Sequence, residues 1–157
     1  MKAKSPLQKN QQKFLEELFS LLRFKSISTS TGFKEEAAAC FDWLNDWIKA
    51  LGFKTERWEC DAYPTLYAED LSAGPDKPTV LIYGHYDVQP ADPEELWASP
   101  AFEPEVRDGY IYARGANDNK GNLFASLLAL RYIKELKGTL GVNVKLVIEG
   151  EEEIGSP

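Results

Sequence analysis

A short apolar run that ends in glycine constrains the fold more than any other feature of this sequence. Residues 79–83 are β-favouring, and Gly84, His85, Tyr86 and Asp87 follow directly. Such a run predicts a strand that is buried on both faces, as in parallel sheets. Because positions i and i+2 share a face of a strand, we expect His85, the only histidine in the chain, and Asp87 to point the same way. Ligands bind at this carboxyl end of strands in open α/β sheets.

Apolar residues at helical spacing predict three helices. The first runs from Pro6, with Ser5 as its N-cap, to about Phe24; the others run over about 34–51 and 119–137. Further strands are expected at residues 53–60, 66–69, 105–107, 110–113 and 142–148. Helices interleaved with strands predict an α/β domain, with helices packed on a mixed, largely parallel sheet.

Composition excludes several classes of partner. The net charge is −7, and the sequence has no cluster of Lys and Arg of the kind that nucleic acids attract. No apolar run approaches the roughly 20 residues of a membrane span, and no signal peptide is visible. Cys40 and Cys60 form no C-x-x-C pattern, so we expect reduced thiols in a cytoplasmic protein.

A second polar motif precedes the third predicted helix. Asp118 stands between Gly115 and Gly121, two glycines that allow tight backbone paths. A helix N-cap is the simplest role for Asp118, and the alternative is a carboxylate aimed at the strand ends. Arg114 and Lys120 are most simply surface charges.

A third motif, the acidic run Glu149–Glu153, follows directly on an apolar strand. Charge runs are usually solvated, and the loop spacing of a calcium site is absent. This run nevertheless begins at a strand end, as His85 does. One imidazole with several carboxylates is an N/O donor set suited to Zn²⁺, or to Mn²⁺ or Co²⁺.

The three motifs together resemble those of metallopeptidase family M20, which comprises dinuclear zinc dipeptidases and deacylases. The chain reads GHYDVQP at 84–90, ARGANDNKG at 113–121 and EGEEEIGS at 149–156. Ala113 and Ala101 stand where the family usually has Gly and Pro. The Val-Gln-Pro after Asp87 and the Glu-Gly before the acidic run are closest to the carnosine-type dipeptidase branch.

The resemblance implies a role for each polar residue of the first two motifs. His85 would bind the first metal. Asp87 would hydrogen-bond to the ring nitrogen of His85 that does not bind the metal. Asp118 would bridge two metals, with a cis peptide to Asn119. The implied cofactor is Zn²⁺, two per complete site, with Mn²⁺ or Co²⁺ possible.

The resemblance also sets a register for the glutamates. With Gly155-Ser156 matched to the family pattern, Glu152 is the general base and Glu153 a ligand of the second metal. The alternative register makes Glu151 the general base and Glu152 the ligand, and it loses the match at Gly155-Ser156.

The implied function is hydrolysis of dipeptides or short peptides by a metal-activated water. Two alternatives stay open: an N-acyl amino acid deacylase of the same family, and a truncated, non-catalytic relative. The resemblance further implies that residues 1–157 are the N-terminal portion of the catalytic domain. The remaining ligands and a lid or dimerisation domain would lie beyond it, so that the 157-residue chain alone is inactive and the full-length protein a homodimer.

Overall fold

Helices and strands follow one another along the chain in the order that the sequence predicts. The computed structural model describes residues 6–157, with side chains from residue 10 onward. The helices are α1 (Pro6–Arg23), α2 (Lys34–Ala50) and α3 (Lys120–Lys137), and the strands are β1 (Lys54–Trp58), β2 (Thr65–Asp70), β3 (Thr79–His85), β4 (Glu105–Arg107), β5 (Tyr110–Tyr112) and β6 (Asn143–Glu149). Single 3₁₀ turns are η1 (Thr31–Phe33), η2 (Glu94–Leu96) and η3 (Glu152–Ile154). The predicted Ser5 cap lies outside the described residues.

The main sheet has four strands in the order β1-β2-β6-β3, and β4 and β5 form a separate hairpin. The pairs β1–β2 and β2–β6 are antiparallel, whereas β3–β6 is parallel. The α/β class and the mixed sheet are therefore confirmed. The expectation of a largely parallel sheet is wrong for these strands, because the β1–β2 hairpin joins β6 in the antiparallel direction.

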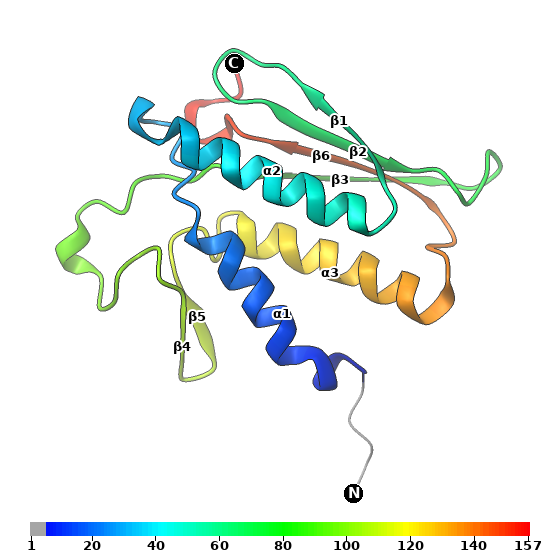
Figure 1. Ribbon diagram of the computed structural model, residues 1–157, viewed down its shortest axis with the longest axis horizontal. Helices are drawn as coiled ribbons and strands as arrows, with labels where there is room; N and C mark the ends of the chain where they lie inside the picture. The colour runs from blue at the N-terminus through cyan, green and yellow to red at the C-terminus, as the bar shows by residue number, and fades with distance from the viewer. Residues whose placement is uncertain (1–5) are drawn as a thin grey trace, which may run out of the picture.

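Strand β3 is not buried on both faces, contrary to the prediction from its composition. Leu81 and Tyr83 are 63% and 55% exposed. All three α-helices lie on one side of the sheet, and β3 is its last strand (Figure 1). One face and one edge of β3 are therefore uncovered, and an apolar sequence alone did not reveal this.

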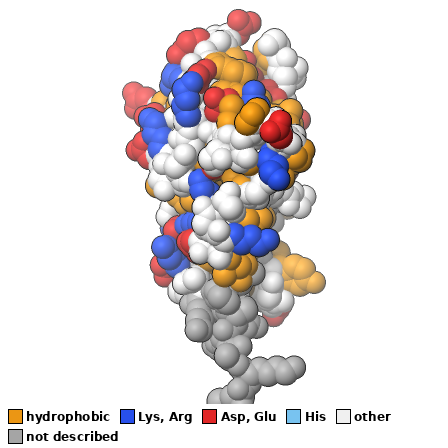
Figure 2. Space-filling model, turned by 90° about the vertical axis from the view of Figure 1, so that its right-hand side faces the viewer, with side chains coloured by type: hydrophobic (Ala, Val, Ile, Leu, Met, Phe, Trp, Pro, Cys, Tyr) orange, Lys and Arg blue, Asp and Glu red, His pale blue; other side chains and the backbone are white. Residues whose placement is uncertain are grey.

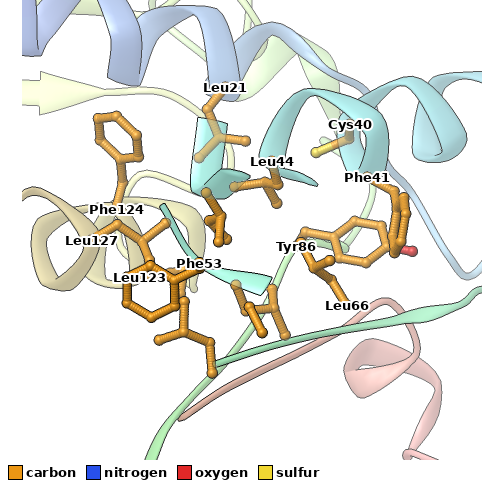
Figure 3. Close-up of a cluster of buried hydrophobic side chains, with 14 of the residues drawn as sticks. Leu21, Cys40, Phe41, Leu44, Phe53, Leu66, Tyr86, Leu123, Phe124 and Leu127 are labelled. Atoms are coloured by element: carbon orange, nitrogen blue, oxygen red, sulfur yellow. The ribbon is translucent and has the colours of Figure 1, made fainter. Parts of the chain in front are cut away.

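The core lies between the helices and one face of the sheet. Tyr86 packs against Phe41 with ring centroids 6.1 Å apart, and its side chain points into this cluster (Figure 3). The other labelled members are Leu21, Cys40, Leu44, Phe53, Leu66, Leu123, Phe124 and Leu127. Burial of these apolar groups supplies most of the driving force for the fold.

A partly buried ion pair lies at the end of the domain opposite the strand ends that carry the motifs. Lys134 of α3 donates to the carbonyl oxygen of Leu51 at 2.7 Å and to Asp70 Oδ2 at 2.8 Å. Burial by itself raises the pKa of Asp70, but hydrogen bonds from Lys134 and Ser72 outweigh it and hold the pKa below its ordinary value. The ionised pair therefore ties α3 to the end of α2 and to β2.

Candidate metal centre

Three distant segments meet where β3 and β6 end. These strands are parallel neighbours, with His85 beside Glu149 in the register. The turn that precedes α3 lies against Gly84, where an added Cβ would be 2.8 Å from Asn119 Oδ1. The backbone N–H of His85 donates to that same oxygen at 3.3 Å. Glycine at position 84 thus lets the turn that carries Asp118 approach the strand.

The two ring nitrogens of His85 face different partners. Nδ1 lies 3.1 Å from the carbonyl oxygen of Asp87 and 3.3 Å from its Oδ1. Nε2 lies 3.1 Å from Asp118 Oδ1 and 3.8 Å from Glu152 Oε2. Because Nδ1 can donate to Asp87, Nε2 is left to bind a cation.

The pKa of His85 reflects this environment. Burial of the ring lowers its pKa, but the hydrogen bond from Nδ1 to Asp87 and the charge of that carboxylate outweigh burial and raise the pKa to about 9. A cation binding at Nε2 must therefore displace a proton at neutral pH.

Asp87 is itself held from two sides. Its carboxylate is 1% exposed, and Oδ2 accepts hydrogen bonds from the Ser28 hydroxyl at 2.6 Å and from the N–H of Glu153 at 3.0 Å. Burial raises the pKa of Asp87, but the hydrogen bonds from His85, Ser28 and Glu153 outweigh it and lower the pKa. The side chains of His85 and Asp87 lie together, and Tyr86 between them points into the core, as strand alternation predicts.

Asp118 is not the N-cap of α3. The N-cap is Asn119, which makes no side-chain capping bond, and the Asp118–Asn119 peptide is cis. The carboxylate of Asp118 is 70% exposed and faces His85 Nε2. It therefore borders the open side of the site.

The adjacent glutamates have separate environments. Glu151 is 3% exposed, and its Oε1 accepts hydrogen bonds from the backbone N–H groups of Ala62 and Tyr63. Glu152 and Glu153 instead turn their carboxylates toward His85, and ligand atoms from these three residues lie within 4.8 Å of one another. The geometry thus distinguishes Glu151, which has a structural contact, from Glu152 and Glu153, which face the site.

Two basic residues that would most simply be surface charges are instead packed. Lys120 is fully buried, and its Nζ donates to the carbonyl oxygen of Phe24 at 2.7 Å. Burial lowers the pKa of Lys120. Arg114 donates to the carbonyl oxygen of Pro90 at 2.8 Å and lies over the ring of Trp97. The surface-charge interpretation was wrong because tertiary packing, not residue type, decides burial.

Two residues that support the site were not singled out from the sequence. Ser28 belongs to a Ser/Thr-rich loop, and no local pattern points to its bond with Asp87. Gln89 stands within the first motif, but only the structure shows its contacts with Glu153. Both contacts join residues about 60 positions apart.

The donor set fits a divalent cation. Ligand atoms of His85, Glu152 and Glu153 lie within 4.8 Å of one another, and Asp118 Oδ1 lies 3.1 Å from His85 Nε2. Carboxylates gathered this closely repel one another unless a cation lies between them. Imidazole nitrogen with carboxylate oxygens suits Zn²⁺, and also Mn²⁺ or Co²⁺.

The fold and this donor set define the class: an α/β domain with a candidate metal centre at its strand ends. The sequence pattern of peptidase family M20/M25/M40 matches residues 81–157. The chain belongs to this family.

Relatives and solved structures agree with this assignment. The chain is 42% identical over 93 residues to Beta-Ala-His dipeptidase of Mus musculus, a match that covers 59% of the chain. It is 34% identical over 151 residues to Cysteinylglycine-S-conjugate dipeptidase of Corynebacterium striatum, covering 93% of the chain. Human carnosine dipeptidase 1 superposes on 96% of the chain with a TM-score of 0.87 and 32% identity. The metallo-carboxypeptidase Sso-CP2 of Sulfolobus solfataricus superposes on 92% with a TM-score of 0.80 and 40% identity.

The matched proteins are considerably longer. The chain spans 19% and 32% of the two dipeptidases, and 34% and 32% of the two solved structures. Among residues 6–157, no helix has both the length and the apolar character needed to cross a membrane.

Proposed function

We propose that this chain is part of the catalytic domain of a metal-dependent hydrolase that cleaves dipeptides or short peptides. The observation that carries the proposal is the convergence of His85 Nε2 with the carboxylates of Asp118, Glu152 and Glu153 where β3 and β6 end. The two dipeptidase relatives support a dipeptide as the substrate.

In this proposal, His85, Asp118 and Glu153 hold zinc, two ions per complete site, with Mn²⁺ or Co²⁺ as possible substitutes. Zinc supplies polarisation of the substrate carbonyl and a lowered pKa for a water molecule. Asp87 holds the imidazole of His85 with Nε2 directed at the site. The two matched dipeptidases are each about three times as long as this chain, which supports further ligands and a lid or dimerisation domain outside it.

Glu152 is the proposed general base. Its side chain is 41% exposed, so it can reach a water and a substrate on the open side of the site. It takes a proton from the attacking water and delivers it to the leaving amine. Glu151 is unsuited to this task because two backbone N–H groups already engage its Oε1.

A deacylase is the second candidate. Succinyl-diaminopimelate desuccinylase of Delftia acidovorans is 34% identical over 122 residues, and the chain covers 32% of its length. An N-acyl amino acid and a dipeptide present the same amide to the site, so the residues described here serve either reaction. The intact donor set argues against the third candidate, a non-catalytic relative.

We further propose a cytoplasmic protein, homodimeric when full length, without a nucleic-acid partner. Cys40 and Cys60 are free thiols, as a reducing compartment would keep them. The net charge is −7, and acidic, basic and apolar side chains are interspersed on the face shown in Figure 2.

The test measures zinc stoichiometry and hydrolysis of dipeptides and N-acyl amino acids. It compares this chain with the full reading frame that contains it, each beside a Glu152→Gln variant. We expect two zinc ions and Glu152-dependent dipeptide turnover in the longer protein, and weak metal binding without turnover in the 157-residue chain. Absence of metal and turnover from both would favour the non-catalytic relative.

A further inference from the structure

Gln89 makes a two-point contact with a proposed metal ligand. Its side-chain Nε2 donates to Glu153 Oε2 at 2.9 Å and to the carbonyl oxygen of Glu153 at 3.2 Å. Gln89 lies two residues after Asp87, in the stretch that connects β3 to the loop before η2. The side chain is half-buried, so water competes only in part for these hydrogen bonds.

The chemistry of the partners assigns the orientation of the amide. An ionised carboxylate and a backbone carbonyl only accept hydrogen bonds, so the NH₂ group, and not the amide oxygen, must face Glu153. Both amide hydrogens are then in use. A neighbouring bond from the N–H of Glu153 to Asp87 Oδ2 adds a third point of attachment.

We propose that Gln89 is a positioning residue that presents Glu153 to the metal centre. Its bond to Oε2 restrains the rotation of the carboxylate and engages one of its two oxygens. Hydrogen-bond partners of this kind orient the ligands of metal sites and raise metal affinity. The inference rests on the proposed function, because it requires Glu153 to be a ligand.

The experiment titrates the metal-free protein made from the full reading frame that contains this chain with Co²⁺ alone, followed by calorimetry and by the visible absorption of the bound ion. Gln89→Met keeps the length of the side chain and removes both donors, and Gln89→Asn keeps an amide that is too short to reach both acceptors. Gln12→Met is the matched control, because Gln12 makes a similar bond to Glu16, at 3.1 Å, on the exposed face of α1.

A double-mutant cycle separates positioning from a general effect on folding. It combines Gln89→Met with Glu153→Gln. If Gln89 acts through Glu153, the double variant binds Co²⁺ no more weakly than Glu153→Gln alone. If Gln89 is merely structural, the two losses add.

We expect Gln89→Met to weaken Co²⁺ binding by about 10- to 100-fold. Gln89→Asn should lose less, and Gln12→Met should stay within about twofold of wild type. The absorption of the bound Co²⁺ should also weaken in Gln89→Met, since a released carboxylate can bind with both oxygens and raise the coordination number. Circular dichroism and urea unfolding report whether each variant is folded.

Two results would overturn the inference while leaving the proposed function intact: wild-type Co²⁺ affinity in Gln89→Met, or additive losses in the cycle. Failure of the wild-type full-length protein to bind Co²⁺ at all would overturn the metal centre itself, and the inference with it.

Discussion

Glu151 offers the sharpest test of how the acidic run is used. Of the adjacent glutamates, it alone is buried, at 3% exposure, and its Oε1 accepts from Ala62 N–H at 2.5 Å and from Tyr63 N–H at 2.9 Å. These bonds tie the entrance of η3 to the turn between β1 and β2. Replacing Glu151 by alanine removes both and leaves the N–H of Tyr63 without a partner.

The expected cost follows from these contacts. A hydrogen bond to a charged acceptor contributes about 1.5–3 kcal/mol, and the lower half of that range applies to the partly exposed Ala62 N–H, which water can reach. Glu151→Ala should therefore lower the free energy of unfolding by about 3–5 kcal/mol. Glu151→Gln should cost about 1 kcal/mol, because an amide oxygen can accept both bonds and only the charge is lost.

Urea unfolding followed by circular dichroism measures these differences. With a slope of about 2 kcal/mol/M, the unfolding midpoint of Glu151→Ala should fall by about 1.5–2.5 M. The matched control is Glu152→Ala, whose exposed side chain should change the free energy of unfolding by no more than about 0.5 kcal/mol.

Equal unfolding midpoints for Glu151→Ala and Glu152→Ala would refute the structural role of Glu151. The alternative register, which pairs Glu151 with Glu152 as base and ligand, predicts a different result for the longer protein. It requires Glu151→Gln to abolish turnover without loss of stability, whereas the register supported here assigns that behaviour to Glu152→Gln.

Three further substitutions test contacts around the site and core. Gly150→Ala would place a Cβ 2.3 Å from the hydroxyl of buried Tyr86, so we expect a loss of about 1–3 kcal/mol, measured as a lower melting temperature. Ser28→Ala removes a buried donor from Asp87 and should cost about 1–3 kcal/mol in urea unfolding. Asp70→Asn should destabilise the protein at neutral pH. Folding lowers the pKa of Asp70, so its negative charge stabilises the folded protein at pH values above the ordinary pKa of 3.8. This stabilisation disappears as the pH falls through the lower pKa of the folded state. Urea unfolding at several pH values would show the loss.

Each of these substitutions has a control or a contradicting outcome. Gly32→Ala meets only Ser30 Oγ at 3.9 Å, and Ser30→Ala alters an exposed side chain, so both should stay within about 0.5 kcal/mol of wild type. A wild-type melting temperature for Gly150→Ala, or Ser28→Ala as stable as Ser30→Ala, would contradict the packing described here. A destabilisation by Asp70→Asn that persists in acid would contradict the role of its charge.

Local patterns predicted the secondary structure well. The second and third helices were expected over 34–51 and 119–137, and α2 and α3 occupy Lys34–Ala50 and Lys120–Lys137. The strands expected at residues 105–107 and 110–113 are also present as β4 and β5, and the turn between them has positive φ at Asp108 and Gly109. Such features depend on spacing and turn chemistry within a few residues, which a sequence displays directly.

Burial was less predictable, because it depends on what covers a segment. Residues 79–83 are as apolar as a central strand, yet β3 is an edge strand with helices on one side only. Lysine is usually a surface residue, yet Lys120 is fully buried and donates to the carbonyl oxygen of Phe24.

The sequence by itself determined the residue types of the site and their places at strand and helix ends. The alternation of side chains along a strand puts His85 and Asp87 on the same side of the backbone, and the order of the three motifs identifies the family. Only the tertiary structure decided which neighbours restrain them. Ser28 reaches Asp87 across 59 residues, Gln89 reaches Glu153 across 64, and Ala62 reaches Glu151 across 89. Such contacts arise when packed helices and paired strands bring distant segments within hydrogen-bond distance, and no local pattern in the chain encodes that proximity.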